Sequence, residues 1–308
     1  MTADLRSHQI MTSKGGEVAK PAVGTLAWAE TSVRLSRRER NQIVAGIART
    51  QVAWALERAR RSNRSRFTSA DVDRVPIVDT AVARAARDLA DAVCDYHVVE
   101  HCERSYYWSW LTAKFEGLDV DSEALYVANI LHDLGLGERN RDAARDGDFA
   151  VVGGMQAREL LMAHGWALGP ATEVGDSIGM HLNPIVSAER HGALARVLSI
   201  GPAMDFFGFG SHRFSDEAVV AVTSRHPRPS STKDLLPDIE HGPGTRPVLL
   251  LKLGVGRFIP RNPLDRVSVH VSSLNGLAGD APFRQRTLTG RGRTLRAEAE
   301  EPISEEES

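Results

Sequence analysis

The stretch Leu125–Leu136, LYVANILHDLGL, constrains the fold of this chain more than any other, because it is apolar on almost every side. A helix with so little polar surface is expected to be buried inside a domain. The run nevertheless ends on adjacent His132 and Asp133, and a buried charge needs a partner or a metal ion. Gly135 and Gly137 follow, and we expect them to take left-handed conformations that end the helix. The sequence therefore predicts a buried helix that carries an imidazole and a carboxylate at its C-terminal end.

The rest of the chain also indicates helices, since apolar residues recur at helical spacing and no alternating run is long enough to require a sheet. In the helix expected at 149–164, Met155 is predicted to face the core. The helix expected at 193–206 carries Asp205 at the end of an apolar stripe, and Pro202 is a point where it can kink or restart. The other expected helices are one capped by Asp79 that runs to Val93, and those at 98–114, 170–181 and 217–225.

Four regions follow from composition. Residues 1–35 are expected to be a flexible lead. Residues 36–74 are a basic helical extension, with ten arginines against two glutamates between Arg34 and Arg66. Residues 75–265 form the helical core, and residues 266–308 are expected to be a disordered acidic tail, with six glutamates in the last twelve positions.

Net charge, apolar content and cysteine spacing indicate which cellular compartment and which partners to expect. The formal net charge is −2, and no apolar run reaches the roughly 18 residues of a membrane span. The first 20 residues lack the apolar core of a secretory signal, and Cys94 and Cys102 are spaced unlike a redox or zinc pair. We therefore expect a cytoplasmic protein with no membrane partner. The basic extension lacks interleaved aromatic residues, so a nucleic-acid partner is not expected either.

A small set of histidines and aspartates lies on the predicted helices among apolar neighbours. Each taken alone also fits a core residue with a local hydrogen-bond partner. Together they supply imidazole and carboxylate ligands, which suit zinc, iron, manganese or nickel. The set is His101, His132, Asp133, His181 and Asp205.

The order of His101, His132-Asp133 and Asp205 resembles the H…HD…D pattern of the HD-domain superfamily of metal-dependent hydrolases. Five local segments are similar to its cyanamide hydratase-like branch, over roughly residues 75–265. These segments are HCERSYYW, ANILHDLGL, FAVVGGMQARELL, SIGMHLN and ARVLSIGPAMDFFG.

The resemblance implies an all-α HD-domain helical bundle with a single buried metal site and disordered termini. In that family pattern His101, His132, Asp133 and Asp205 are the ligands of one divalent transition metal, for which zinc is the first expectation and iron, manganese or nickel are alternatives. His181 is placed next to the water or substrate, so that His181 and Asp133 are the predicted catalytic residues. The implied substrate is a small nitrile-, cyanamide- or amide-like molecule.

Two departures from the superfamily pattern bear on the substrate. Many phosphohydrolases of the superfamily carry a lysine where this chain has Leu136. The chain therefore lacks a cation that could bind a substrate phosphate at this position. The position after Phe149 is Ala150, where the hydratase branch often has an acidic residue. Four other cations remain as substitutes for the lysine, namely Arg104, Lys114, Arg139 and Arg141.

Two alternatives therefore stay open. The first is a phosphohydrolase of the same fold that acts on a nucleotide or phosphomonoester, with a second metal bound by His164 and His181. His164 is a poor candidate, because it directly precedes a helix-ending glycine. The second is a non-catalytic regulatory module whose metal is structural. Whether the chain forms a homo-oligomer is left open.

Overall fold

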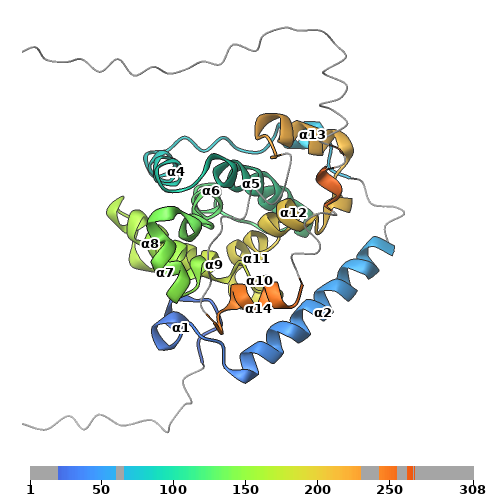
Figure 1. Ribbon diagram of the computed structural model, residues 1–308. Helices are drawn as coiled ribbons and strands as arrows, with labels where there is room; N and C mark the ends of the chain where they lie inside the picture. Colours follow the sequence, from blue (N-terminus) through green and yellow to red (C-terminus); the bar gives the residue numbers. More distant parts are fainter. Residues whose placement is uncertain (1–19, 60–65, 230–242, 255–261, 266, 268–308) are drawn as a thin grey trace, which may run out of the picture.

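The computed structural model describes residues 20–59, 66–229, 243–254, 262–265 and 267 (Figure 1). Regular structure within these residues is helical, without a β-strand, and Phe67 and Phe214 form an isolated bridge. The α-helices are α1 Leu26–Thr31, α2 Arg37–Ala59, α3 Ser69–Val72, α4 Ala81–Val93, α5 Tyr96–Glu116, α6 Ser122–Leu131, α7 Arg141–Asp146, α8 Phe149–Ala163, α9 Leu168–Met180, α10 Ala188–His191, α11 Ala193–Leu198, α12 Gly201–Phe207, α13 Asp216–Arg225 and α14 Arg246–Lys252. Short 3-10 helices are η2 Leu134–Leu136, η3 Glu138–Asn140 and η4 Ser211–Arg213.

The all-α expectation is confirmed for the described part of the chain. Helices α5 and α6 form the centre of the bundle, with α12 against α5 and the pair α8 and α9 beside α6 (Figure 1). The expected apolar run of α6 is buried along its length, from Leu125 to Leu131 except at Tyr126. No helix in the described ranges is long and apolar enough to cross a membrane.

The end of α6 differs from the expectation for its glycines. Neither Gly135 nor Gly137 has a left-handed conformation. A Cβ atom on Gly135 would lie 2.0 Å from the carbonyl oxygen of Phe149, and one on Gly137 would lie 2.4 Å from that of Val93. Both positions require glycine because the backbone of η2 packs directly against the start of α8 and the end of α4. This close packing fixes the turn that carries His132 and Asp133.

The expected helix at 193–206 is two helices. Helix α11 ends at Leu198, and α12 begins at Gly201 with Pro202 in its first turn. Proline is tolerated there because a backbone N–H in the first turn has no partner within the helix. Two smaller expectations were also wrong. Thr80, not Asp79, caps α4, and Met155 is 43% exposed.

The flexible lead expected over residues 1–35 does not extend to residue 35. Residues 20–35 contain α1, in which Leu26 and Trp28 are only 4% and 1% exposed. The indole Nε1 of Trp28 donates to Oε1 of Glu39 at 3.2 Å. Two buried side chains in so short a helix leave no periodic signal, which is why composition suggested a flexible segment. Residues 1–19 and the expected tail, apart from residue 267, lie outside the described residues.

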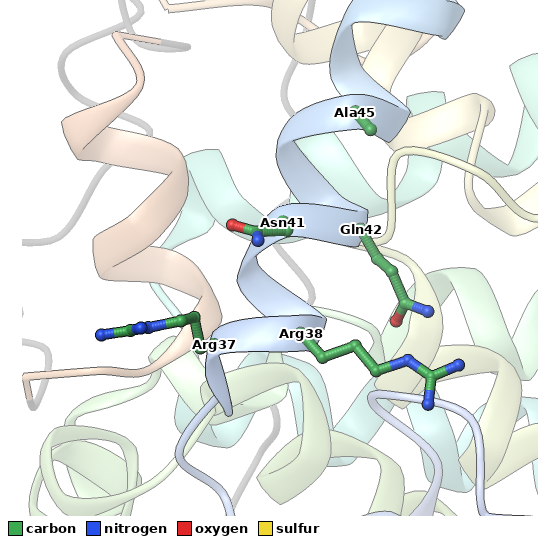
Figure 2. Close-up of a pocket in the computed structure, with 5 residues that line it drawn as sticks. All are labelled: Arg37, Arg38, Asn41, Gln42 and Ala45. Carbon is green, nitrogen blue, oxygen red and sulfur yellow. The ribbon is translucent and has the colours of Figure 1, made fainter.

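Helix α2, which lies within the expected basic extension 36–74, runs along the outside of the bundle (Figure 1). Ile43 is buried, the hydroxyl of Thr50 donates to the carbonyl of Pro184 at 2.6 Å, and Glu57 binds Arg213 near the other end. Figure 2 shows a surface hollow along its N-terminal half, and no residue that lines it belongs to the set predicted as a site. The lining residues are Arg37, Arg38, Asn41, Gln42 and Ala45.

Candidate metal centre

Three of the predicted residues form a buried cluster of possible metal ligands. His101 from α5, His132 and Asp133 each offer one ligand atom, and these atoms lie within 4.8 Å of one another. The Nε2 atoms of the two histidines are 3.3 Å apart, and Oδ2 of Asp133 is 3.3 Å from Nε2 of His132 and 3.6 Å from Nε2 of His101. The residues are 3%, 1% and 9% exposed, so the donors face one another away from solvent.

A fourth predicted residue, His181, lies near the other oxygen of the same carboxylate. It follows the last residue of α9, and its Nε2 lies 3.8 Å from Oδ1 of Asp133. Its ring centre is 5.0 Å from that of His132. His164, by contrast, is exposed at the end of α8, where its Nδ1 lies 2.8 Å from the carbonyl oxygen of Leu160.

The imidazole rings of His101, His132 and His181 are oriented in the same way. Nδ1 of His132 is 2.6 Å from the carbonyl oxygen of Asn129, and Nδ1 of His181 is 2.7 Å from that of Ile178. Nδ1 of His101 is 2.7 Å from Oδ2 of Asp205. A neutral imidazole that donates from Nδ1 keeps a lone pair on Nε2, which is the usual arrangement of a metal-binding histidine. A histidine whose pKa is raised, such as His132, would give up its Nε2 proton on binding a metal ion. The chemistry and orientation of the donors therefore fit a divalent metal ion.

The remaining predicted residue, Asp205, lies behind His101 and outside the cluster. Both of its oxygens are already engaged. Oδ2 accepts from His101 and from Nη2 of Arg104 at 2.9 Å. Oδ1 accepts from Nε of Arg104 at 2.9 Å, Nε1 of Trp108 at 3.0 Å and Nη1 of Arg228 at 2.9 Å. In this arrangement Asp205 orients His101 and does not face the other ligand atoms.

Burial and mutual electrostatic interactions shift the pKa values of Asp133, His132 and His181. Burial would raise the pKa of Asp133, but the neighbouring His132 holds that pKa well below its usual range. Burial opposes the charged form of His132, yet Asp133 raises its pKa well above the ordinary value. Burial, followed by the nearby His132, lowers the pKa of His181 to about 3. At neutral pH the carboxylate is therefore ionised and His181 is neutral.

A buried ion pair that the sequence did not suggest lies at the end of α9, next to His181. Arg246 at the start of α14 is fully buried, and its Nε donates to Oδ2 of Asp148 at 2.8 Å. Its Nη2 donates to the carbonyl of Gly179 at 2.6 Å, and its Nη1 to Oδ1 of Asn183 at 2.8 Å. The guanidinium thus joins the start of α8 to the end of α9. Arg246 lies in a segment without periodicity, so no sequence signal pointed to it.

Aromatic rings flank the cluster on two sides. The ring centre of Phe149 is 5.9 Å from that of His181, and the ring centre of Phe206 is 6.0 Å from that of His101. The segment 106–110 of α5 is rich in aromatic residues. Tyr106 and Trp108 are buried in the core.

The described part of the chain thus defines a class: a helical protein with a buried His–His–Asp group that could hold a metal ion. No protein-family model matches the chain. Two curated proteins of Saccharomyces cerevisiae (strain ATCC 204508 / S288c), cyanamide hydratase DDI2 and cyanamide hydratase DDI3, are each 27% identical to it over 157 residues. The match covers 50% of this chain and 69% of each relative, and it supports a cyanamide hydratase-like relationship and an enzyme.

Proposed function

We propose that this protein is a metal-dependent hydratase or hydrolase of the HD-domain type, which adds water to a small nitrile-, cyanamide- or amide-like molecule. The observation that carries the proposal is the convergence of three Nε2 atoms on the two oxygens of Asp133. The similarity to two yeast cyanamide hydratases supports the same reaction class.

His101, His132 and Asp133 would hold one divalent transition metal, with zinc as the first expectation. Two imidazole nitrogens and one carboxylate oxygen are a common donor set for zinc and for iron, manganese or nickel. A structural zinc site is closed by four protein ligands, whereas a catalytic site has three and leaves a position open. The three mutually close donors match the catalytic arrangement, which disfavours a purely structural role.

When bound, the metal would lower the pKa of a water molecule and polarise the substrate. The protein side chains then handle the proton. For a nitrile-like substrate, His181 accepts one proton from water as the oxygen bonds to carbon, and returns it to the substrate nitrogen. Oδ1 of Asp133, 3.8 Å away, stabilises the transient imidazolium.

The charges around the cluster favour an uncharged substrate over a phosphate. Arg104 binds Asp205, Arg228 binds both Asp205 and Asp265, and Arg246 binds Asp148, so these three guanidinium groups are matched by three carboxylates. Leu136 is buried where related phosphohydrolases carry lysine. Lys114, one of the possible substitutes, lies over the ring of Trp110 at the far end of α5. Arg139 and Arg141, the other two possible substitutes, are exposed. We therefore rank the phosphohydrolase second.

The test is metal analysis of the purified protein together with assays on cyanamide, nitriles, amides and phosphomonoesters. We expect about one transition-metal ion per chain, hydration of a nitrile-like substrate, and loss of both in His132→Ala. Two ions per chain with phosphoester hydrolysis would support the phosphohydrolase instead. A bound metal without activity on any of these classes would support the non-catalytic module.

A further inference from the structure

Arg228 holds Asp205 from outside the helix that carries His101. Its Nη1 donates both to Oδ1 of Asp205, at 2.9 Å, and to the backbone carbonyl of Asp205, at 2.8 Å. The side chain of Arg228 is only 2% exposed, although the residue follows α13 in a segment without regular structure. A guanidinium that is so deeply buried needs carboxylate partners, and Asp205 is the first of them.

The other edge of the same guanidinium is anchored on a second segment. Nε and Nη2 of Arg228 donate to Oδ1 of Asp265 at 3.1 and 2.9 Å. Asn262, three residues before Asp265, donates from Nδ2 to the backbone carbonyl of Asp205 at 2.7 Å. Two segments that are distant in the sequence therefore meet at Asp205, and Arg228 joins them.

This arrangement matters because the other donors to the Asp205 carboxylate share one helix. His101, Arg104 and Trp108 all project from α5, so they hold Asp205 relative to α5 alone. Arg228 supplies the bond that comes from a different part of the chain. Arg228 thus holds Oδ1 together with Arg104 and Trp108, while Oδ2 accepts from Arg104 and from Nδ1 of His101.

We propose that Arg228 is a positioning residue for metal binding, which holds Asp205 so that His101 directs its Nε2 at the cluster. The effect is indirect, since Arg228 reaches His101 only through the carboxylate. The inference rests on the proposed function in one respect, namely that a metal ion binds to His101, His132 and Asp133. Loss of partners that orient a metal-binding histidine lowers metal affinity by roughly 10–100-fold.

The experiment compares full-length wild-type protein with Arg228→Gln and with Arg225→Gln. Arg225 is a matched control, because it is a neighbouring arginine whose carboxylate partner, Asp73, is 63% exposed. Zinc affinity is measured by competition with a chromogenic chelator, and the thermal midpoint of each metal-free protein is measured separately. A purely structural role would lower the metal-free midpoint and leave the zinc affinity unchanged.

We expect Arg228→Gln to bind zinc roughly 10-fold or more weakly and Arg225→Gln to bind like wild type. If Arg228→Gln does not fold, the zinc affinities of Arg228→Lys and Asp265→Asn are measured in its place. Lysine keeps the charge but cannot span both carboxylates at once, and Asp265→Asn removes only the outer anchor. Wild-type zinc affinity in the folded variants would overturn this inference alone. An absence of zinc binding by the wild-type protein would overturn the proposed function, and this inference with it.

Discussion

Oδ1 of Asp133 lies 3.8 Å from Nε2 of His181, while Oδ2 of the same carboxylate faces His101 and His132. One oxygen is thus turned towards the predicted ligands and the other towards the predicted proton carrier. This division predicts different outcomes for changes on the two sides of the carboxylate.

Asp133→Asn should abolish metal binding and activity together. The amide keeps the shape of the side chain but removes its negative charge from between three imidazoles. Metal content by elemental analysis and turnover of a nitrile-like substrate check the expectation. Full metal occupancy in this variant would show that the charge of Asp133 is not needed to hold the ion.

His181→Gln should retain the metal but lose turnover. Because His181 is assigned to proton transfer, its removal should lower kcat by roughly 10²–10⁴-fold, with metal content close to wild type. His164→Gln is the control, since His164 is exposed and distant from the cluster along α8. A His181→Gln protein that loses its metal would instead make His181 a ligand.

Arg246→Gln should destabilise the fold strongly. It leaves the fully buried Asp148 carboxylate without its cationic partner, and breaking a buried pair typically costs about 3–5 kcal/mol. Arg84→Gln, which breaks an exposed pair with Asp79, should cost less than about 1 kcal/mol. Urea unfolding followed by circular dichroism measures both. Equal free energies of unfolding for the two variants would contradict the assigned importance of the buried pair.

Glu57 should make stability sensitive to acid. Its hydrogen bond from His212 and its pair with Arg213 lower the pKa of this carboxyl from 4.5 to about 2 in the folded state. Since the folded pKa is below the unfolded one, the contribution is complete above about pH 4.5 and is lost as the pH falls towards 2.

Glu57→Gln removes that contribution at every pH. The difference in thermal midpoint between wild type and variant should therefore shrink as the pH is lowered from 6 to about 3. A difference that stays constant over this range would show that the carboxyl of Glu57 does not gain from its partners. The variant isolates Glu57 from the other carboxyls that titrate in the same range.

The sequence was informative where a polar residue interrupts an apolar helix face. His132, Asp133 and His181 were singled out on this basis and His101 mainly by the family resemblance, and the structure brings the four together. Asp205 was identified by the same pattern, but nothing in the sequence indicated that Arg228 binds its carboxylate. That arginine lies outside any helix, so periodicity carries no information about it. The helix break after Leu198 also changes the register that the pattern assumed.

Backbone packing was the other feature that periodicity did not reveal. Gly135 and Gly137 were correctly singled out near the end of α6, but for the wrong reason. Glycine is needed there because neighbouring carbonyl oxygens leave no room for a side chain, not because the backbone turns left-handed. Such a contact joins residues far apart in the sequence, and a local pattern cannot distinguish it from a helix-ending turn.

The Nδ1 atoms of His101, His132 and His181 contact partners at very different separations in the sequence. His132 and His181 are each oriented by a carbonyl three residues earlier, within the last turn of their own helices. His101 is oriented by Asp205, 104 residues away. Two rings are thus set as soon as α6 and α9 form, whereas the third is set only when α5 and α12 dock. Local opening of α12 would therefore release the ring of His101 while the rings of His132 and His181 stay aligned. The affinity of the proposed site for a metal ion should thus depend on the docking of this one helix.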